Sequence, residues 1–130
     1  TRPGGVVGAS VWDLAGERAP ISPFWVAAKR LRASAQDEAG LAGARQGHLA
    51  GIFEEAGLHD VETAEHTSRV RYESFDEWWR PYTFGVGPAG AYATSLPEDE
   101  REALREQCRD VLPEAPFELA ATAWAVRGVV

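Results

Sequence analysis

The chain of 130 residues contains no methionine and only one cysteine, and Lys29 is its single lysine. Without a methionine, Thr1 is not expected to be the natural start of the protein. Because Cys108 has no partner cysteine, an internal disulfide is excluded, and a reducing, cytoplasmic compartment is the default expectation. No signal peptide opens the chain, and no apolar run approaches the roughly 20 residues of a membrane-spanning helix.

Basic charge is also scarce. Thirteen Lys and Arg residues stand against 20 Asp and Glu residues, which gives a formal net charge of -7, and the arginines are scattered. Nucleic-acid binding depends on neutralising phosphates, and anionic membrane surfaces attract basic segments. We therefore expect neither a nucleic-acid partner nor a membrane partner.

The most informative segment that is present lies at the beginning. The turn Arg2-Pro3-Gly4-Gly5 leads into residues 6–12, a run with almost no polar side chains. Such a run is typical of a strand that is covered on both faces, as in the middle of a parallel sheet. A central strand needs a neighbour on each side, and only a turn precedes this one. We therefore expect the chain to be the second half of a larger fold.

The following segments predict two helices and a strand. Ser22 is expected to cap a helix that has Pro23 in its first turn. One face of this helix is apolar: Phe24, Ala27, Ala28 and Leu31. A second helix is expected over residues 44–56, ended by Gly57. Residues 61–72 predict a strand with charges on both faces, which is typical of a sheet edge.

The second half predicts two further helices and a last strand. Ser74 and Glu77 form a capping box for a short helix, which Pro81 should end or kink. A turn-rich loop is expected over residues 85–90, and a second capping box over residues 95–98. The helix that follows has an apolar stripe: Leu104, Cys108, Val111 and Leu112.

The last segment, residues 117–126, is apolar on both faces and predicts a central strand. The chain would thus have two central strands and one edge strand. Helices between the first two strands favour a crossover connection and a parallel pair.

Two motifs resemble the C-terminal half of class I S-adenosylmethionine-dependent methyltransferases. Arg2-Pro3-Gly4-Gly5-Val6-Val7 resembles the turn that enters the fifth strand of that fold, and residues 47–58 resemble the helix before its sixth strand. The resemblance covers essentially all of the chain but about half of the family domain. It implies an α/β, three-layer fragment of a Rossmann-like fold, with a mixed sheet whose last strand is antiparallel and inserted between the first and second.

The resemblance also implies how the chain is organised. Residues 1–130 would form a single partial domain, and residues 74–95 look like the insertion that some small-molecule methyltransferases carry near the substrate. The family's glycine-rich cofactor loop and its ribose-binding acid are missing. The string Gly85-x-Gly87-x-x-Gly90 follows a proline-broken helix and not a strand, so it lacks the context of a dinucleotide loop. We expect S-adenosylmethionine to be the cofactor of the parent protein and no cofactor to bind this chain alone.

Six residues are candidates for contact with a small-molecule substrate. Trp12 and Asp13 end the first strand, and ligands gather at the carboxyl ends of strands in open α/β sheets; the alternative is a buried tryptophan and a turn-forming aspartate. Trp78, Trp79 and Tyr82 share a helical side with Phe75 and form either a substrate wall or a packed core. Because adjacent tryptophans point in different directions, one of that pair is expected to stay partly exposed or to face a pocket.

Trp25 stands off its helix's apolar face, which suggests a lid residue, an oligomer contact or a residue packed under the following loop. The three histidines, His48, His59 and His66, lack the neighbours and spacing of a metal site. Cys108 fits a buried structural thiol. No catalytic residue can be assigned from spacing alone.

These observations favour a fragment of a methyltransferase that acts on a small molecule, with the substrate side only and no activity alone. The alternative is a non-catalytic α/β module that forms a homodimer, or pairs with another protein, through the exposed edge of residues 6–12.

Overall fold

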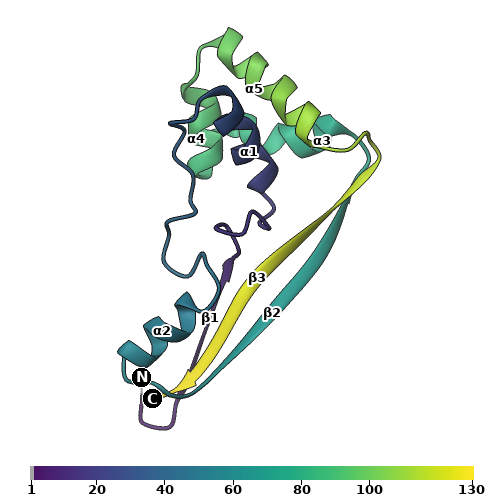
Figure 1. Cartoon of the computed structure of the whole chain (residues 1–130). Helices are drawn as coiled ribbons and strands as arrows, with labels where there is room; N and C mark the ends of the chain where they lie inside the picture. The colour runs from purple at the N-terminus through teal and green to yellow at the C-terminus, as the bar shows by residue number, and fades with distance from the viewer. Residues whose placement is uncertain (1) are drawn as a thin grey trace. The chain divides into compact units, whose positions relative to one another are not determined.

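The computed structural model describes residues 2–130 and shows an α/β chain in which helices and strands alternate (Figure 1). Its elements, in chain order, are β1 (Val6–Trp12), α1 (Ser22–Leu31), α2 (His48–Glu55), β2 (His59–Tyr72), α3 (Phe75–Trp79), the 3-10 helix η1 (Arg80–Phe84), α4 (Gly87–Ser95), α5 (Glu98–Val111) and β3 (Phe117–Val129).

The three strands form one sheet in the order β1-β3-β2. β1 and β3 are antiparallel, with Val6 opposite Val129 and Trp12 opposite Ala123. β2 also runs against β3, because early residues of one strand meet late residues of the other, as in the pair of Glu62 with Arg127. Both pairings are therefore antiparallel, so the sheet of the described residues is not mixed, and β1 and β2 do not pair with each other.

β1 lies at the edge of this sheet, which corrects the prediction of a central strand covered on both faces. Its side chains alternate between exposed and half-buried, and none is buried. The half-buried ones pack toward Leu49 and Phe53 of α2, whereas Val6 on the other face is 62% exposed. Within residues 2–130 only β3 is central, and β2 is an edge strand, as its charges predict.

The chain divides into two compact units. The first contains β1, α2 and most of β2 and β3, from residues up to Ala19, Glu38–Ser68 and Ala120–Val130. Its small core includes Leu49, Phe53 and Val126. The second contains the other helices, from Pro20–Asp37 and Arg69–Leu119, and holds a larger, aromatic core. The expected insertion over residues 74–95 lies inside this second unit.

Local signals at several helix ends are confirmed. Ser74 caps α3, because its Oγ accepts a 3.1 Å hydrogen bond from the amide of Glu77. Helix α3 ends just before Pro81, which lies in η1. Gly57, which follows α2, has the left-handed φ of 81° that glycine adopts without strain.

Other helix ends differ from expectation. Ser22 is the first helical residue, and Ile21 stands at the N-cap. The expected loop over residues 85–90 contains the start of α4, whose Pro88 fits the first turn because an amide there needs no helical partner. The capping box at residues 95–98 does not form: Ser95 ends α4, its hydroxyl donates to the carbonyl of Tyr92, and α5 begins after Pro97 without a side-chain cap.

Candidate functional site

The carboxyl end of β1 places Asp13 inside the first unit. Asp13 is 3% exposed, and its amide donates a 2.9 Å hydrogen bond to the carbonyl of Thr122 on β3. Its carboxylate accepts hydrogen bonds from the amide of Gly16 at 3.0 Å and from Nε of Arg18 at 2.6 Å. The backbone carbonyl of Asp13 accepts the amide of Arg18. Asp13 therefore stabilises the turn after β1. This is the turn-forming role that the sequence predicts as the alternative to a ligand contact.

Arg18 connects this turn to the rest of the sheet. Its guanidinium also donates to both carboxylate oxygens of Glu65 on β2, at 3.4 and 3.3 Å, and lies 5.1 Å from the ring centroid of Trp124 on β3. Sequence analysis missed this cluster because Arg18 and Glu65 are 47 positions apart. No local pattern signals such a pair.

The charges of the cluster are mutually stabilised. Burial alone would raise the pKa of Asp13, but hydrogen bonds from Arg18 and Gly16, the nearby indole of Trp124 and the charge of Arg18 together lower it below its ordinary value. The buried Nε1 atom of Trp124 completes no hydrogen bond with any described residue. A carboxylate with a lowered pKa is a poor proton acceptor, so the arrangement suits a structural ion pair and not a general base.

Trp12 differs from its neighbour. Successive strand residues point to opposite faces, and Trp12 is 42% exposed where Asp13 is buried. The alternative of a buried Trp12 is therefore wrong. Of this pair, only Trp12 offers a surface that a ligand could touch.

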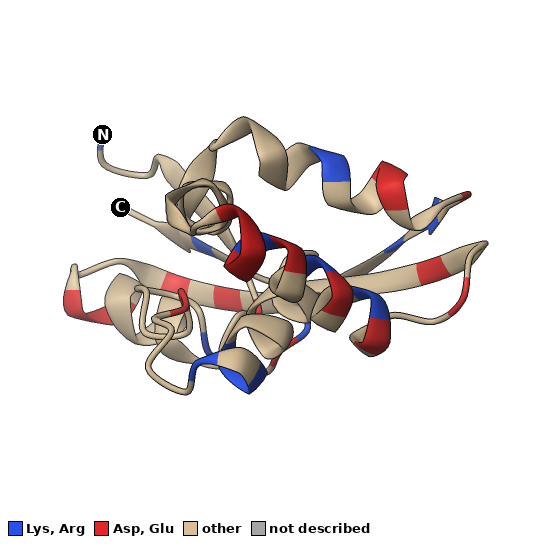
Figure 2. Cartoon of the chain, turned by 90° about the horizontal axis from the view of Figure 1, so that it is seen from above, with Lys and Arg blue, Asp and Glu red and all other residues tan. Residues whose placement is uncertain are grey.

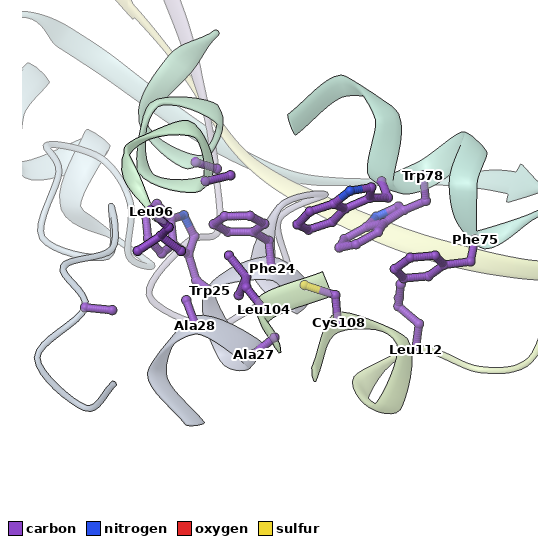
Figure 3. Packing of buried hydrophobic residues seen from close by; sticks show 14 of the residues in the cluster. Phe24, Trp25, Ala27, Ala28, Phe75, Trp78, Leu96, Leu104, Cys108 and Leu112 are labelled. Carbon is purple, nitrogen blue, oxygen red and sulfur yellow. The ribbon is translucent and has the colours of Figure 1, made fainter. Parts of the chain in front are cut away.

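The other four candidates belong to the core cluster of the second unit, in which Tyr82 is only partly buried. Figure 3 labels Trp25 and Trp78 in this cluster, together with Phe24. The ring of Phe24 is the centre of this cluster: it stacks on Tyr82 at 4.7 Å between centroids and meets Trp25 edge-on at 5.2 Å. Trp78 is 2% exposed and Trp79 is 6% exposed, so the first alternative, that one of them stays partly exposed, is wrong. These tryptophans pack as core residues because each finds another aromatic ring beside it.

Trp25 is also a core residue. It is 5% exposed and its ring centroid lies 5.6 Å from that of Tyr92 on α4. Neither a lid nor an oligomer contact fits this burial. Tyr82 is half-buried, and burial raises the pKa of its phenol far above the ordinary value, so its hydroxyl stays protonated at neutral pH.

The structure thus groups Trp25, Trp78, Trp79 and Tyr82 in the second unit and Trp12 with Asp13 in the first. Only Trp12 and Tyr82 keep a substantial accessible surface.

The glycine string over residues 85–90 follows η1 and enters α4, so it does not lie between a strand and a helix, which is the context of a cofactor loop. The glycines of the string over residues 85–90 serve the chain itself: Gly85 has a left-handed φ of 69°, and a Cβ on Gly90 would lie 3.1 Å from the carbonyl carbon of Gly85. The string forms the turn between η1 and α4 and continues into the first turn of α4.

The described residues contain no group of three His, Cys, Asp or Glu side chains that could hold a metal ion. His48 has a local role, because its Nδ1 accepts a 3.2 Å hydrogen bond from the amide of Gly43. Figure 2 shows the basic positions distributed along the chain and interspersed with acidic ones. Among residues 2–130, no helix has the length and apolar character needed to cross a bilayer.

No known protein-family model matches the chain, and no curated protein matches it significantly.

Proposed function

We propose that the chain is the substrate-side half of an S-adenosylmethionine-dependent methyltransferase that acts on a small molecule. The observation that carries this proposal is the strand order β1-β3-β2 with both pairings antiparallel. A last strand that runs against its neighbours and lies between the two preceding strands is the arrangement that the resemblance implies. The Pro-Gly-Gly turn that enters β1 supports the same interpretation.

The second unit supports a role on the substrate side. It is formed by the helical segments that follow β1 and β2, and its core is built mainly from aromatic rings (Figure 3). Rings that pack on one another form a rigid wall, and methyl transfer depends chiefly on positioning the acceptor and excluding water. In this proposal the buried tryptophans support the wall, and Tyr82 contacts the substrate. Trp12 belongs to the first unit and is a separate candidate contact.

The cofactor would be held by the other half of the parent protein, because the residues described here do not fit it. The chain's own contribution would be to bind and orient the methyl acceptor. The carboxylate of Asp13 is not placed to accept a proton, since it is already paired with Arg18.

Calorimetry with S-adenosylmethionine tests the proposal. The chain alone should give no binding heat, and the chain joined to the residues encoded immediately upstream of Thr1 should bind the cofactor. Low-micromolar affinity of the chain alone would overturn the division into halves. An upstream segment without a strand and a glycine-rich loop would overturn the family assignment.

A second candidate function is supported by the edge of β1. The amide of Asp13 and the carbonyl of Gly5 bond to β3, so the alternating pattern turns the backbone groups of Val6, Gly8 and Ser10 outward. Residues 6–12 carry no charge that would discourage pairing with another strand. A non-catalytic module could therefore form a dimer, or bind a partner, through this edge.

The mass in solution and hydrogen exchange test this second candidate. A dimer whose amides at Val6, Gly8 and Ser10 exchange slowly would support pairing through β1. A monomer in which these amides are fully protected would count against it, since another part of the same chain would then cover the edge.

A further inference from the structure

A small hollow lies in the second unit where α1, α4 and α5 diverge. Its volume is about 170 Å³, and it is lined by the end of α1, the last turn of α4 and the second turn of α5. All three helices belong to the second unit, and α1 and α4 both pack against α5. None of the six substrate candidates lines this hollow.

The lining is mainly apolar and partly aromatic. Leu96 lines the hollow at 9% exposure, and Leu104, which is fully buried, packs beneath its floor. Tyr92 adds an aromatic wall, which Trp25 supports from behind at 5.6 Å between ring centroids. The wall is therefore held in place by the aromatic core.

Leu31 gives independent support for an occupant. It continues the apolar face of α1, on which Phe24, Ala27 and Ala28 are all 0% exposed, yet Leu31 itself is 48% exposed. It lines the hollow. A ligand seated there would cover the one member of this apolar face that the chain leaves open.

The rim carries both a donor and an acceptor. The Nη2 atom of Arg32 donates a 2.8 Å hydrogen bond to Oε2 of Glu100, and both side chains are about half exposed, at 53% and 45%. Exposed ion pairs of this kind are weak. A hydroxyl group can accept from the arginine and donate to the carboxylate, so it complements the pair as it stands.

We propose that this hollow binds a single aromatic ring that bears a hydroxyl group. The size fits one ring, because an apolar cavity of about 150 Å³ in another protein holds benzene, whereas drug-sized ligands need about 300 Å³ or more. A carboxylate on the ligand would have to displace Glu100, and a ring without a polar group would leave the rim unused. This binding does not rest on the proposed function, because the candidate substrate residues of that function lie outside the hollow.

The test is a titration of the full, isotope-labelled chain with p-cresol, followed by two-dimensional amide NMR without S-adenosylmethionine. The amide signals of Leu31, Tyr92 and Ala103 should shift together, with a Kd on the order of 1 mM, as expected for so small a ligand. Toluene, which lacks the hydroxyl, should bind more weakly.

A matched pair of variants locates the ligand. Ala103 is exposed and lines the hollow, so Ala103→Phe fills it with little risk to the fold. Ala91 is exposed on α4 and does not line it, so Ala91→Phe is the control. Ala103→Phe should weaken p-cresol binding at least about tenfold and Ala91→Phe should leave it unchanged.

Three results would overturn the proposal: no shifts at up to about 10 mM p-cresol, shifts centred on the exposed Phe84 instead of the hollow, or equal binding by the two variants. Toluene binding as tightly as p-cresol would overturn the assignment of the hydroxyl. Cofactor binding is measured in a separate experiment. If the extended chain failed to bind S-adenosylmethionine, the p-cresol result would stand, and if p-cresol failed to bind, the cofactor result would stand.

Discussion

The Nε atom of Arg18 donates a 2.6 Å hydrogen bond to Oδ2 of Asp13, and this pair anchors the turn that follows β1. Asp13 is buried, while the guanidinium of Arg18 extends to Glu65 on the far edge strand of the first unit. One ion pair therefore links the end of β1 to both other strands, through Glu65 on β2 and the ring of Trp124 on β3.

Replacing Asp13 by Asn should make the stability of the chain less dependent on acid. The pKa of Asp13 lies below its ordinary value of 3.8 in the folded chain. Its stabilisation is therefore present above the unfolded pKa and is lost as the pH falls through the folded pKa. At neutral pH the free energy of unfolding of the variant should be lower by about 1 kcal/mol. The loss is no larger because solvent around Arg18 screens the ion pair.

Urea denaturation of both proteins at about pH 7 and about pH 3 measures this effect. The difference in the free energy of unfolding between the unsubstituted chain and the Asp13→Asn variant should be smaller at the lower pH. A difference that stays constant with pH would show that the charge of Asp13 contributes nothing.

Gly16→Ala should destabilise the turn. A Cβ at this position would lie 2.3 Å from Oδ2 of Asp13, which Arg18 and the amide of Gly16 hold in place. The free energy of unfolding should fall by about 1–2 kcal/mol, which is comparable with the loss of one hydrogen bond to a charged group.

Gly51→Ala is the control for the Gly16→Ala substitution. Gly51 lies inside α2 and a Cβ there meets no atom within 4 Å, so this change should stabilise the chain by about 0.5–1 kcal/mol. Thermal unfolding of both variants gives the comparison. Equal shifts in the same direction would contradict the account of the turn.

The thiol of Cys108 should be almost unreactive in the folded chain. Cys108 is 0% exposed on α5, and burial raises its pKa to about 12. N-ethylmaleimide at mildly alkaline pH should modify it rapidly in denaturant and at least about a hundredfold more slowly in native buffer, since the thiolate is the reactive form. Similar rates in the two conditions would show that α5 opens readily.

Phe24→Ala should have the largest effect on stability of the substitutions considered. Phe24 is 0% exposed and contacts Trp25, Trp79 and Tyr82, so its removal leaves a cavity at the centre of the second unit and should lower the free energy of unfolding by about 3–5 kcal/mol. Phe84→Ala is the matched control, because Phe84 is 63% exposed. Comparable losses in both variants would contradict the assigned core.

Sequence patterns predicted the features that depend on neighbouring residues. The apolar run before Trp12, the capping serine Ser74 and the left-handed Gly57 act within a few positions, and the structure has each of them. Helix α4 differs from the sequence-based expectation, because Gly87, Pro88 and Gly90 together form a pattern typical of a loop. The proline in the first turn was the available signal.

The errors concern contacts between distant segments. β1 looked central because its side chains are apolar, but a pattern does not show how many neighbours a strand has. Trp25 stood off its helical stripe and is buried because Tyr92 of α4 covers it. The Arg18–Glu65 contact joins a loop to β2, and no local pattern predicts such a pair.

The central claim is that the chain is one half of a methyltransferase, and calorimetry with S-adenosylmethionine tests it most directly. The account predicts no binding by the chain alone and low-micromolar binding once the upstream-encoded residues are joined to it. Low-micromolar binding by the chain alone, or no binding by the extended chain, would contradict it.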